Sequence, residues 1–308
     1  MPSAKTVLFV TLGTVAVAFV AMWYAQIRRA RRGGRTDDPA TDARPPTLPQ
    51  LLIGAVTNFF DTLGIGSFAT TTALFRIRGA VPDRLIPGTL NVGHTIPTFL
   101  QAFIYITIVK VDMWTLVPMI AAAALGAWLG SGIVAGWSKR NVQFVMGAAL
   151  LIAAVLMLMK QLGVFPKGGE ELGLRAARLA LGLAGNFLLG ALMTAGIGLY
   201  APCMVLVSLL GMSPTTAFPI MMGSCAFLMP VGSVRFIGLG SYALRAALGL
   251  AIGGVPAVLI AAIVVRSLRL DHVRWLVTAV VIYTALAMLR SALVTTGTHR
   301  PDSNRAGT

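Results

Sequence analysis

Long apolar segments, separated by short polar stretches, run along most of the chain. The first segment, 7–27, ends at a basic cluster that begins with Arg28 and Arg29. A bilayer core about 30 Å thick is crossed by about 20 apolar residues of helix. The pattern therefore predicts an all-α integral membrane protein. The further apolar segments lie at 51–75, 88–109, 114–137, 141–160, 178–210, 216–238, 243–265 and 273–290.

The segments after the first form two groups of four, which align without a gap when the chain is shifted by 132 residues. Matched glycines and prolines are the strongest sign of a repeat, because these residues fix the shape of the backbone. The identical pairs include Thr62 and Thr194, Gly64 and Gly196, Ile65 and Ile197, Gly66 and Gly198, Leu74 and Leu206, Gly79 and Gly211, Pro82 and Pro214, and Pro87 and Pro219.

The polar stretches and the repeat divide the chain into regions. Strong positive charge follows the first apolar segment instead of preceding it, which favours an uncleaved transmembrane helix over a signal peptide, the alternative. Pro-, Asp- and Arg-rich sequence then forms a linker in the cytoplasm. The expected regions are an N-terminal transmembrane helix (1–27), a polar linker (28–50), a first repeat (51–160), a second linker (161–177), a second repeat (178–292) and a disordered tail (293–308).

The opening segment of each repeat, 51–75 and 178–210, is interrupted by glycine-rich polar sequence. Irregular backbone at membrane depth is tolerated only inside protein or beside a water-filled cavity. Paired repeats that open with broken or re-entrant helices are typical of secondary transporters, whose substrate site lies where the breaks meet. The pattern therefore predicts a multi-pass transporter in the cytoplasmic (inner) membrane.

The basic residues leave the relative orientation of the two repeats open. The loop 76–84 carries three arginines while its partner loop, 211–216, carries no charge, which favours opposite orientations. The basic pair Lys139 and Arg140, however, corresponds to a basic stretch at 266–274, which favours the same orientation.

Composition supports the membrane class and argues against several others. Hydrophobic residues make up 56% of the chain and charged residues 11%, with a mean hydropathy of +0.81. The net charge of +15 comes mostly from Lys and Arg at the ends of apolar segments, where they orient helices. The two cysteines, Cys203 and Cys225, lack the spacing of a metal site. Because no enzyme motif is present either, we expect no catalytic role, no cofactor, no bound metal and no nucleic-acid partner.

Asp61 is the only acidic residue inside a predicted span. A carboxylate at membrane depth is costly and commonly marks a proton or ion pathway. We therefore predict that Asp61 couples a proton to transport. The alternative is that it caps the half-helix that starts near Gly64. The second repeat has Met193 at the matching position, so this chemistry belongs to the first repeat.

His94 is the only histidine inside a predicted span, and Asn91, Thr95 and Thr98 share its helical face. This face contacts the substrate or relays protons, or else it forms hydrogen bonds between packed helices. The glycines of the two breaks free the backbone to present N–H groups to an anion, or else serve close packing. Threonines after the first break line a cavity or bond back to their own helix. The predicted substrate-binding residues are Gly64, Gly66, Thr70, Thr71, Asn91, His94, Gly196 and Gly198.

The opening of each repeat, Gly54–Pro87 and Gly185–Pro219, resembles the TauE/SafE family, also called sulfite exporters. Shared features are a Gly-rich helix start, GIG, an apolar run, and a loop with Pro before the next helix. The strongest stretch is GIGLYAPCMVLVSLLGMSPTTAF at 196–218, which is similar to the family's GIGGG, Pro, apolar run and Gly-x-Ser-Pro. The resemblance covers about 51–290 and leaves the first helix outside.

The resemblance implies a transporter of sulfite, a sulfonate or a related small sulfur anion, with the lipid bilayer as its surroundings. This chain departs from the family pattern in its shortened glycine runs, GIGS and GIGL, and in Asp61 and the NVGHTIPT stretch. Two alternatives remain at this stage. One is a cation or neutral-solute carrier that uses Asp61, and the other is a membrane-embedded enzyme or scaffold. The sequence does not indicate an oligomeric state.

Overall fold

The computed structural model describes residues 3–33, 37–164 and 167–264, together with 282–283, 285–286, 289–290 and 292–293. Within these residues the regular structure is helical, apart from one isolated β-bridge. The predicted all-α membrane class is therefore confirmed. Most of the apolar segment 273–290 and nearly all of the tail 293–308 lie outside the described residues.

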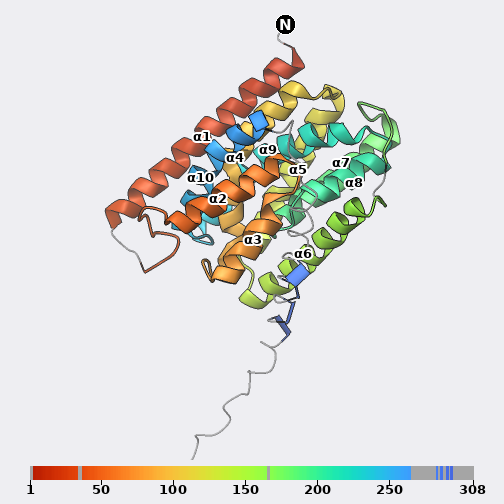
Figure 1. Cartoon of the computed structure of the whole chain (residues 1–308). Coiled ribbons are helices and arrows are strands. Elements are labelled where there is room, and N and C mark those ends of the chain that lie inside the picture. The colour runs from red at the N-terminus through yellow and green to blue at the C-terminus, as the bar shows by residue number, and fades with distance from the viewer. Residues whose placement is uncertain are drawn as a thin grey trace, which may run out of the picture.

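The helices form a single bundle, with α1 running along its outside (Figure 1). Two short 3-10 turns, η1 (Asp83–Leu85) and η2 (Pro214–Thr216), lead into α4 and α9. The α-helices are α1 (Ala4–Gly33), α2 (Leu48–Thr62), α3 (Ser67–Arg78), α4 (Ile86–Ile108), α5 (Met113–Val134), α6 (Lys139–Gln161), α7 (Ala176–Met193), α8 (Tyr200–Leu209), α9 (Ala217–Gly238) and α10 (Leu244–Val264).

Six described helices are long and apolar enough to cross a membrane: α1, α5, α6, α7, α9 and α10. The helix α4 is of similar length, at 23 residues, but it carries His94 and several other polar residues that the core buries. Large apolar side chains on the outer helices, such as Val17, Ile133 and Ile263, are exposed. Such a surface suits lipid, because hydrocarbon accepts apolar side chains but not unpaired backbone groups.

Helices α2 and α3 are too short to cross the bilayer separately. Their 15 and 12 residues span roughly 22 and 18 Å at about 1.5 Å per residue, against a hydrocarbon core of about 30 Å. The break predicted inside 51–75 is the turn 63–66 between them.

The contacts of α2 and α3 with α4 show that they form a hairpin. Asn58 of α2 bonds His94 of α4, and Thr62, further along, bonds Tyr105, so α2 runs parallel to α4. The helix α3 packs on α4 and is joined to its start by the short loop 79–85, so it runs in the opposite direction. The chain therefore enters the bundle in α2 and returns in α3.

Helices α7 and α8 form a second hairpin of the same kind. Asn186 of α7 bonds Ser224 of α9, and Thr194, just past the end of α7, packs against Gly232. The helix α7 therefore runs parallel to α9. The helix α8, only 10 residues long, is joined to α9 by the loop 210–216 and packs against it in the opposite direction.

The corresponding helices α4 and α9 pack antiparallel at the centre of the bundle. Thr89, near the start of α4, accepts a hydrogen bond from the backbone of Ala243, which follows α9. Thr95 lies 3.5 Å from the hydroxyl of Ser233, one turn before the end of α9. These corresponding helices of the two groups therefore run in opposite directions. This is the arrangement of repeats with opposite orientation, the first of the two alternatives that the charges leave open.

Each half of the bundle packs a long helix against the hairpin of the other half. The helix α10 lies along α2, where Gly54 faces the backbone of Gly249 and Leu250. The helix α5 lies along α7, where Gly190 faces the backbone of Ala123. Small residues allow such close approach of helix backbones in a membrane. Both hairpins are therefore held between helices of the two halves.

The helix directions place most basic residues at one end of the bundle. This end holds the end of α1, the α3–α4 loop and the starts of α2, α6 and α10, whereas the opposite end has fewer Lys and Arg. The positive-inside rule assigns the more basic end to the cytoplasm. Its described basic residues include Arg28, Arg29, Arg31, Arg32, Arg44, Arg76, Arg78, Arg84, Lys139, Arg140, Arg235 and Arg245, and those of the opposite end include Lys5, Lys110, Lys160, Lys167, Arg175 and Arg178.

Candidate functional site

The turns of both hairpins depend on glycine. Gly64 and Gly66 have φ angles of +91° and +90°, and Gly196 has +93°. Residues with a side chain rarely adopt such angles. A Cβ atom at Gly64 would also lie 2.6 Å from the hydroxyl of Tyr200, which opens α8. The glycines thus both shape the turns and let the other hairpin approach.

The tips of the two hairpins meet inside the bundle. Tyr200 at the start of α8 packs against Gly64 and Gly66 of the first hairpin. Phe68, near the start of α3, lies 3.7 Å from the Cβ position of Gly198 in the second. The structure therefore brings the two sequence breaks together.

Asp61 lies in the last turn of α2, buried at 7% exposure, and points at the start of α3. Its Oδ1 accepts a hydrogen bond of 2.6 Å from the backbone N–H of Ser67, and its Oδ2 accepts one of 3.0 Å from Gln101. No Lys or Arg forms an ion pair with Asp61 among the described residues. The carboxylate therefore caps α3, as the alternative interpretation predicted, and its role in proton coupling stays a prediction.

A small cavity of about 30 Å³ lies between the hairpin tips. This volume holds about one water molecule, so a larger solute enters only after side chains move. Methionine side chains form much of one wall, and their flexible chains allow such movement. The first half contributes Asp61, Gly66, Ser67, Phe68, Thr98 and Gln101, and the second half contributes Met193, Gly198, Leu199, Tyr200, Met221, Met222, Cys225 and Met229.

His94 is fully buried behind this cavity and does not line it. The side-chain N–H of Asn58 donates to Gly54, so the Asn58 oxygen is free to accept from His94 Nδ1 at 3.0 Å. Nδ1 then carries the ring hydrogen, and Nε2 accepts from the hydroxyl of Thr71 at 3.0 Å. His94 therefore ties α2, α3 and α4 together, as in the packing interpretation.

Several other predicted site residues also point away from the cavity. The Thr70 hydroxyl donates to backbone oxygens of its own turn, and the Asn91 amide donates to the backbone of Pro87. Gly196 packs against Met146. Of the predicted set, the residues that line the central cavity are Asp61, Gly66 and Gly198.

A second cavity of about 40 Å³ lies on the other side of Tyr200. Gly64 lines it together with Lys160 and Gln161 from the end of α6. Tyr200 lines both cavities and therefore separates them. Lys160 lies near the end of α6, at the less basic end of the bundle, so this cavity lies on that side of Tyr200.

Sequence reasoning missed three polar residues of the site. Gln101 donates to both Asp61 and Thr62, Asn58 holds His94, and the Tyr105 hydroxyl donates to the backbone of Thr62. All three are uncharged polar residues inside predicted spans. Asp61 and His94 were selected because they are ionisable residues inside predicted spans. A search that also included amide and phenol side chains inside the spans would have found the three.

Within the described residues, no group of three His, Cys, Asp or Glu side chains lies close enough to hold a metal ion. Cys203 and Cys225 are free and buried, and the Cys225 sulfur lies 3.5 Å from that of Met193. The cavity wall of the second half is therefore made of sulfur and apolar atoms.

The family model named Sulfite exporter TauE/SafE matches residues 2–157, from α1 to near the end of α6. The match includes α1, which the sequence resemblance left outside, and stops before the second hairpin. No curated protein and no solved structure gives a significant match. Because the matched region is more than half of the chain, this protein belongs to the TauE/SafE sulfite exporter family of membrane transporters.

Proposed function

We propose that the protein is a secondary transporter that moves a small sulfur oxyanion, such as sulfite or a sulfonate, together with a proton. Its family supports transport of sulfite or a related anion. The observation that carries the proposal is the meeting of two helical hairpins, whose tips enclose a cavity with one carboxylate and one uncapped helix start. We place this activity in the cytoplasmic membrane.

The two helix starts at the cavity differ in whether they are available to an anion. The start of α3 already binds the carboxylate of Asp61. At α8, the N-cap residue Leu199 makes no side-chain capping bond, and Met193 occupies the position that matches Asp61. The partial positive charge of a helix N-terminus stabilises anions. We therefore place the substrate oxyanion at the start of α8, beside Gly198.

A proton enters the mechanism because Asp61 shares this cavity with the anion. Two negative charges repel strongly where little water screens them. Binding of the anion thus favours the protonated form of Asp61, and protonation of Asp61 favours binding of the anion to the same degree. Ser67 and Gln101 hold the carboxyl group in place throughout. This linkage makes the protein a symporter of anion and proton.

Opening of the cavity requires Tyr200 to move, because its ring separates the central cavity from the one beside Lys160. The ring packs edge-on against Phe218, at 5.7 Å between ring centres. We propose that rotation of Tyr200 joins the two cavities and opens the site towards the outer face.

A cation carrier that uses Asp61 as its ligand is the alternative. Both oxygens of Asp61 already accept hydrogen bonds, and the remaining wall supplies mostly sulfur and apolar atoms. A hard cation prefers several oxygen ligands. The residues around Asp61 therefore suit a proton better than a metal cation.

The test is uptake of radiolabelled sulfite into proteoliposomes driven by a pH gradient. We expect accumulation by the wild type and downhill flux without accumulation by Asp61→Asn. Asp112→Asn, the same change outside the cavity, is the matched control and should accumulate sulfite. Full accumulation by Asp61→Asn would refute proton coupling. In a separate measurement, thermal stabilisation of the purified protein by cations but not by sulfite would favour the cation carrier.

A further inference from the structure

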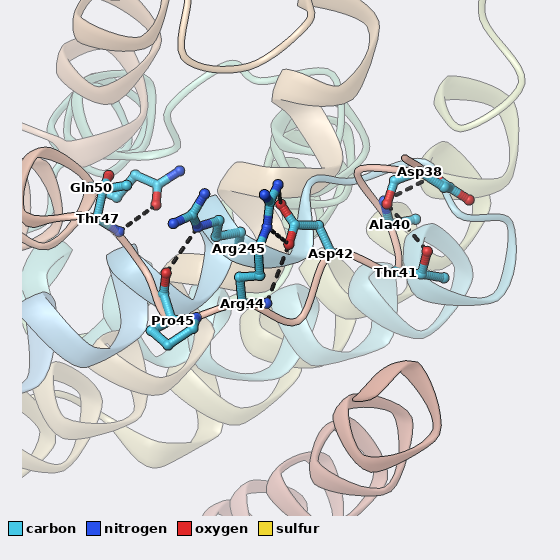
Figure 2. A network of polar contacts seen from close by, with 9 residues as sticks. All are labelled: Asp38, Ala40, Thr41, Asp42, Arg44, Pro45, Thr47, Gln50 and Arg245. Carbon is cyan, nitrogen blue, oxygen red and sulfur yellow. Dashed lines mark hydrogen bonds and ion pairs between the residues drawn. The ribbon is translucent and has the colours of Figure 1, made fainter. Parts of the chain in front are cut away.

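Residues 37–47 of the linker between α1 and α2 pack on the cytoplasmic end of α10. The backbone oxygen of Pro39 accepts from Leu244 N at 2.8 Å. That of Pro45 accepts from Arg245 Nε at 2.8 Å, as Figure 2 shows. Ala40 is buried and touches the turn at Gly240. This part of the linker is thus a docked element of the fold.

Polar contacts inside the linker fix its shape. Both oxygens of Asp42 accept from the guanidinium of Arg44, each at 2.8 Å (Figure 2). Thr47 and Gln50 form a capping box at the start of α2, in which the Gln50 side-chain oxygen accepts from Thr47 N. The linker therefore presents Arg44 and Gln50 in defined positions next to α10.

A cavity of about 290 Å³, which we call the linker cavity, lies between this linker, the α3–α4 loop and the start of α10. It is much larger than the central cavity of about 30 Å³, so a small oxyanion fits without rearrangement. The side chains that matter here are Asp42, Arg44, Gln50, Ala80, Pro82 and Arg245.

Hydrogen-bond donors outnumber acceptors in the linker cavity. Arg245 uses Nε for Pro45, and its two Nη atoms donate to no described residue. The Gln50 oxygen is taken by Thr47, which leaves its amide N–H groups unpaired among the described residues. Asp42 has no oxygen without a partner, because Arg44 occupies both. Two arginines and one aspartate also leave a net positive charge.

We propose that the linker cavity is a second oxyanion site, which captures the anion at the cytoplasmic face. Arg245 binds two oxygens of the anion through its Nη atoms, the geometry that guanidinium groups favour, and Gln50 donates to a third. Binding follows from these donors alone, whereas the role of capture before transport rests on the proposed function. Ala80 and Pro82 place the site at the base of the first hairpin.

The binding test is calorimetric titration of the full-length protein, in detergent without added lipid, with sulfite as the probe. Arg245→Gln should weaken binding about tenfold or more, the loss expected for one charge-assisted pair. Arg84→Gln removes an exposed arginine of the same end from outside the cavity and should leave this affinity unchanged. Equal affinity in the wild type and Arg245→Gln would overturn the proposal.

A second pair of variants covers the case that Arg245→Gln disturbs folding. Ala80→Asp places a negative charge in the cavity without removing any contact, whereas Ala80→Asn adds a side chain of similar size without charge. We expect Ala80→Asp to abolish sulfite binding at this site and Ala80→Asn to retain it. Equal binding by the two variants would contradict an anion site here.

Two further comparisons complete the test. The first distinguishes a free anion from a lipid headgroup in the linker cavity, and the second distinguishes this site from the proposed transport function. If only phosphatidylglycerol, and neither sulfite nor phosphate, binds in an Arg245-dependent way, the occupant is a lipid headgroup and the free-anion proposal is wrong. Asp61→Asn should lose coupling but retain this site. Sulfite binding that needs Arg245 in a protein without sulfite flux would refute the proposed function and leave the site intact.

Discussion

The two hairpins share a backbone design but supply opposite chemistry to the cavity between them. The first hairpin and α4 contribute carboxylate, hydroxyl and amide groups, whereas the second hairpin and α9 contribute sulfur, aromatic and apolar groups. The repeated scaffold thus positions two walls, and differences in side chains make one polar. At the shift of 132, the differing pairs that place a polar residue in the cavity wall of the first half include Asp61 and Met193, Ser67 and Leu199, and Gln101 and Ser233.

The difference has one direct consequence for binding. The start of α3 is occupied by the protein's own carboxylate, while the N-cap residue of α8, Leu199, makes no side-chain capping bond and no other described side chain takes that place. One hairpin therefore carries the proton site and the other is open to the anion. A symmetrical cavity with two capped helices would have no place for an anion, and one with no carboxylate would have no proton to couple.

Making the second hairpin resemble the first should have the largest effect. Met193→Asp places a carboxylate where it can cap α8, as Asp61 caps α3, and so competes with the anion. We expect sulfite affinity to fall about a hundredfold or more, since repulsion adds to the loss of the helix-end site. Met193→Leu, the apolar control, should bind normally. Unchanged affinity in a folded Met193→Asp protein would place the anion elsewhere.

The matched glycines Gly66 and Gly198 give the next largest difference. Gly66 has φ near +90°, whereas Gly198 does not have a positive φ, and the nearest atoms to an added Cβ are at 3.9 and 3.7 Å. An added methyl group therefore has similar space at both positions, but only at Gly66 does it strain the backbone. Gly66→Ala should destabilise the protein by about 1–2 kcal/mol more than Gly198→Ala. Thermal unfolding of the two variants measures this, and equal stability would contradict the strain argument.

Two segments cover the bases of the hairpins and should differ in their response to pH: the linker 37–47, here called the first cover, and residues 167–174, here called the second cover. Hydrogen bonds from Arg44 lower the pKa of Asp42 below its ordinary value, so the ionised pair stabilises the first cover above about pH 4 and is lost as pH falls through the folded pKa. The second cover is held by backbone bonds, from Gly169 to Met212 and from Ser213 to Glu171, and its ion pair between Arg178 and Glu171 is exposed and so contributes little. Protection against hydrogen exchange, relative to the intrinsic exchange rate at each pH, should fall at acid pH in 37–47 only, and Asp42→Asn should reproduce this loss at pH 7. Parallel changes in both covers would contradict the assignment.

The smallest effect is expected at Thr71, whose hydroxyl donates to His94 behind the cavity. Thr71→Val leaves a buried acceptor without a donor and should cost about 1–2 kcal/mol of stability. Sulfite flux of the folded variant should stay within about threefold of wild type, because neither residue lines the cavity. Thr71→Ser should restore stability. A large loss of sulfite flux without loss of stability would contradict this and indicate that His94 contacts the substrate.

Much of the fold was predictable because its signals are local. Apolar length predicted the spans, and matched glycines such as Gly64 and Gly196 predicted where two helices break. The direction of the chain after each break was not predictable, because the basic loops 76–84 and 139–140 point to different arrangements. Packing of α4 against α9, more than 100 residues apart, decides the direction. The docking of the linker likewise depends on Arg245, about 200 residues away.

The site was only partly predictable. Asp61 stood out because carboxylates are rare in membrane spans, whereas Gln101 carries no charge and left little signal. Thr70 and Asn91 lie near the breaks, but sequence cannot tell a hydroxyl or amide that lines a cavity from one that bonds to its own helix. Which face of a helix meets a cavity is set by its neighbours.

The central claim is that anion and proton move together through Asp61, and proton movement tests it most directly. A sulfonate such as methanesulfonate is the best probe, because it stays fully ionised near neutral pH and carries no proton of its own. Proteoliposomes with an internal pH dye should acidify when this probe is added outside, and Asp61→Asn liposomes should not. Sulfonate-dependent acidification of equal size in Asp61→Asn would contradict the claim.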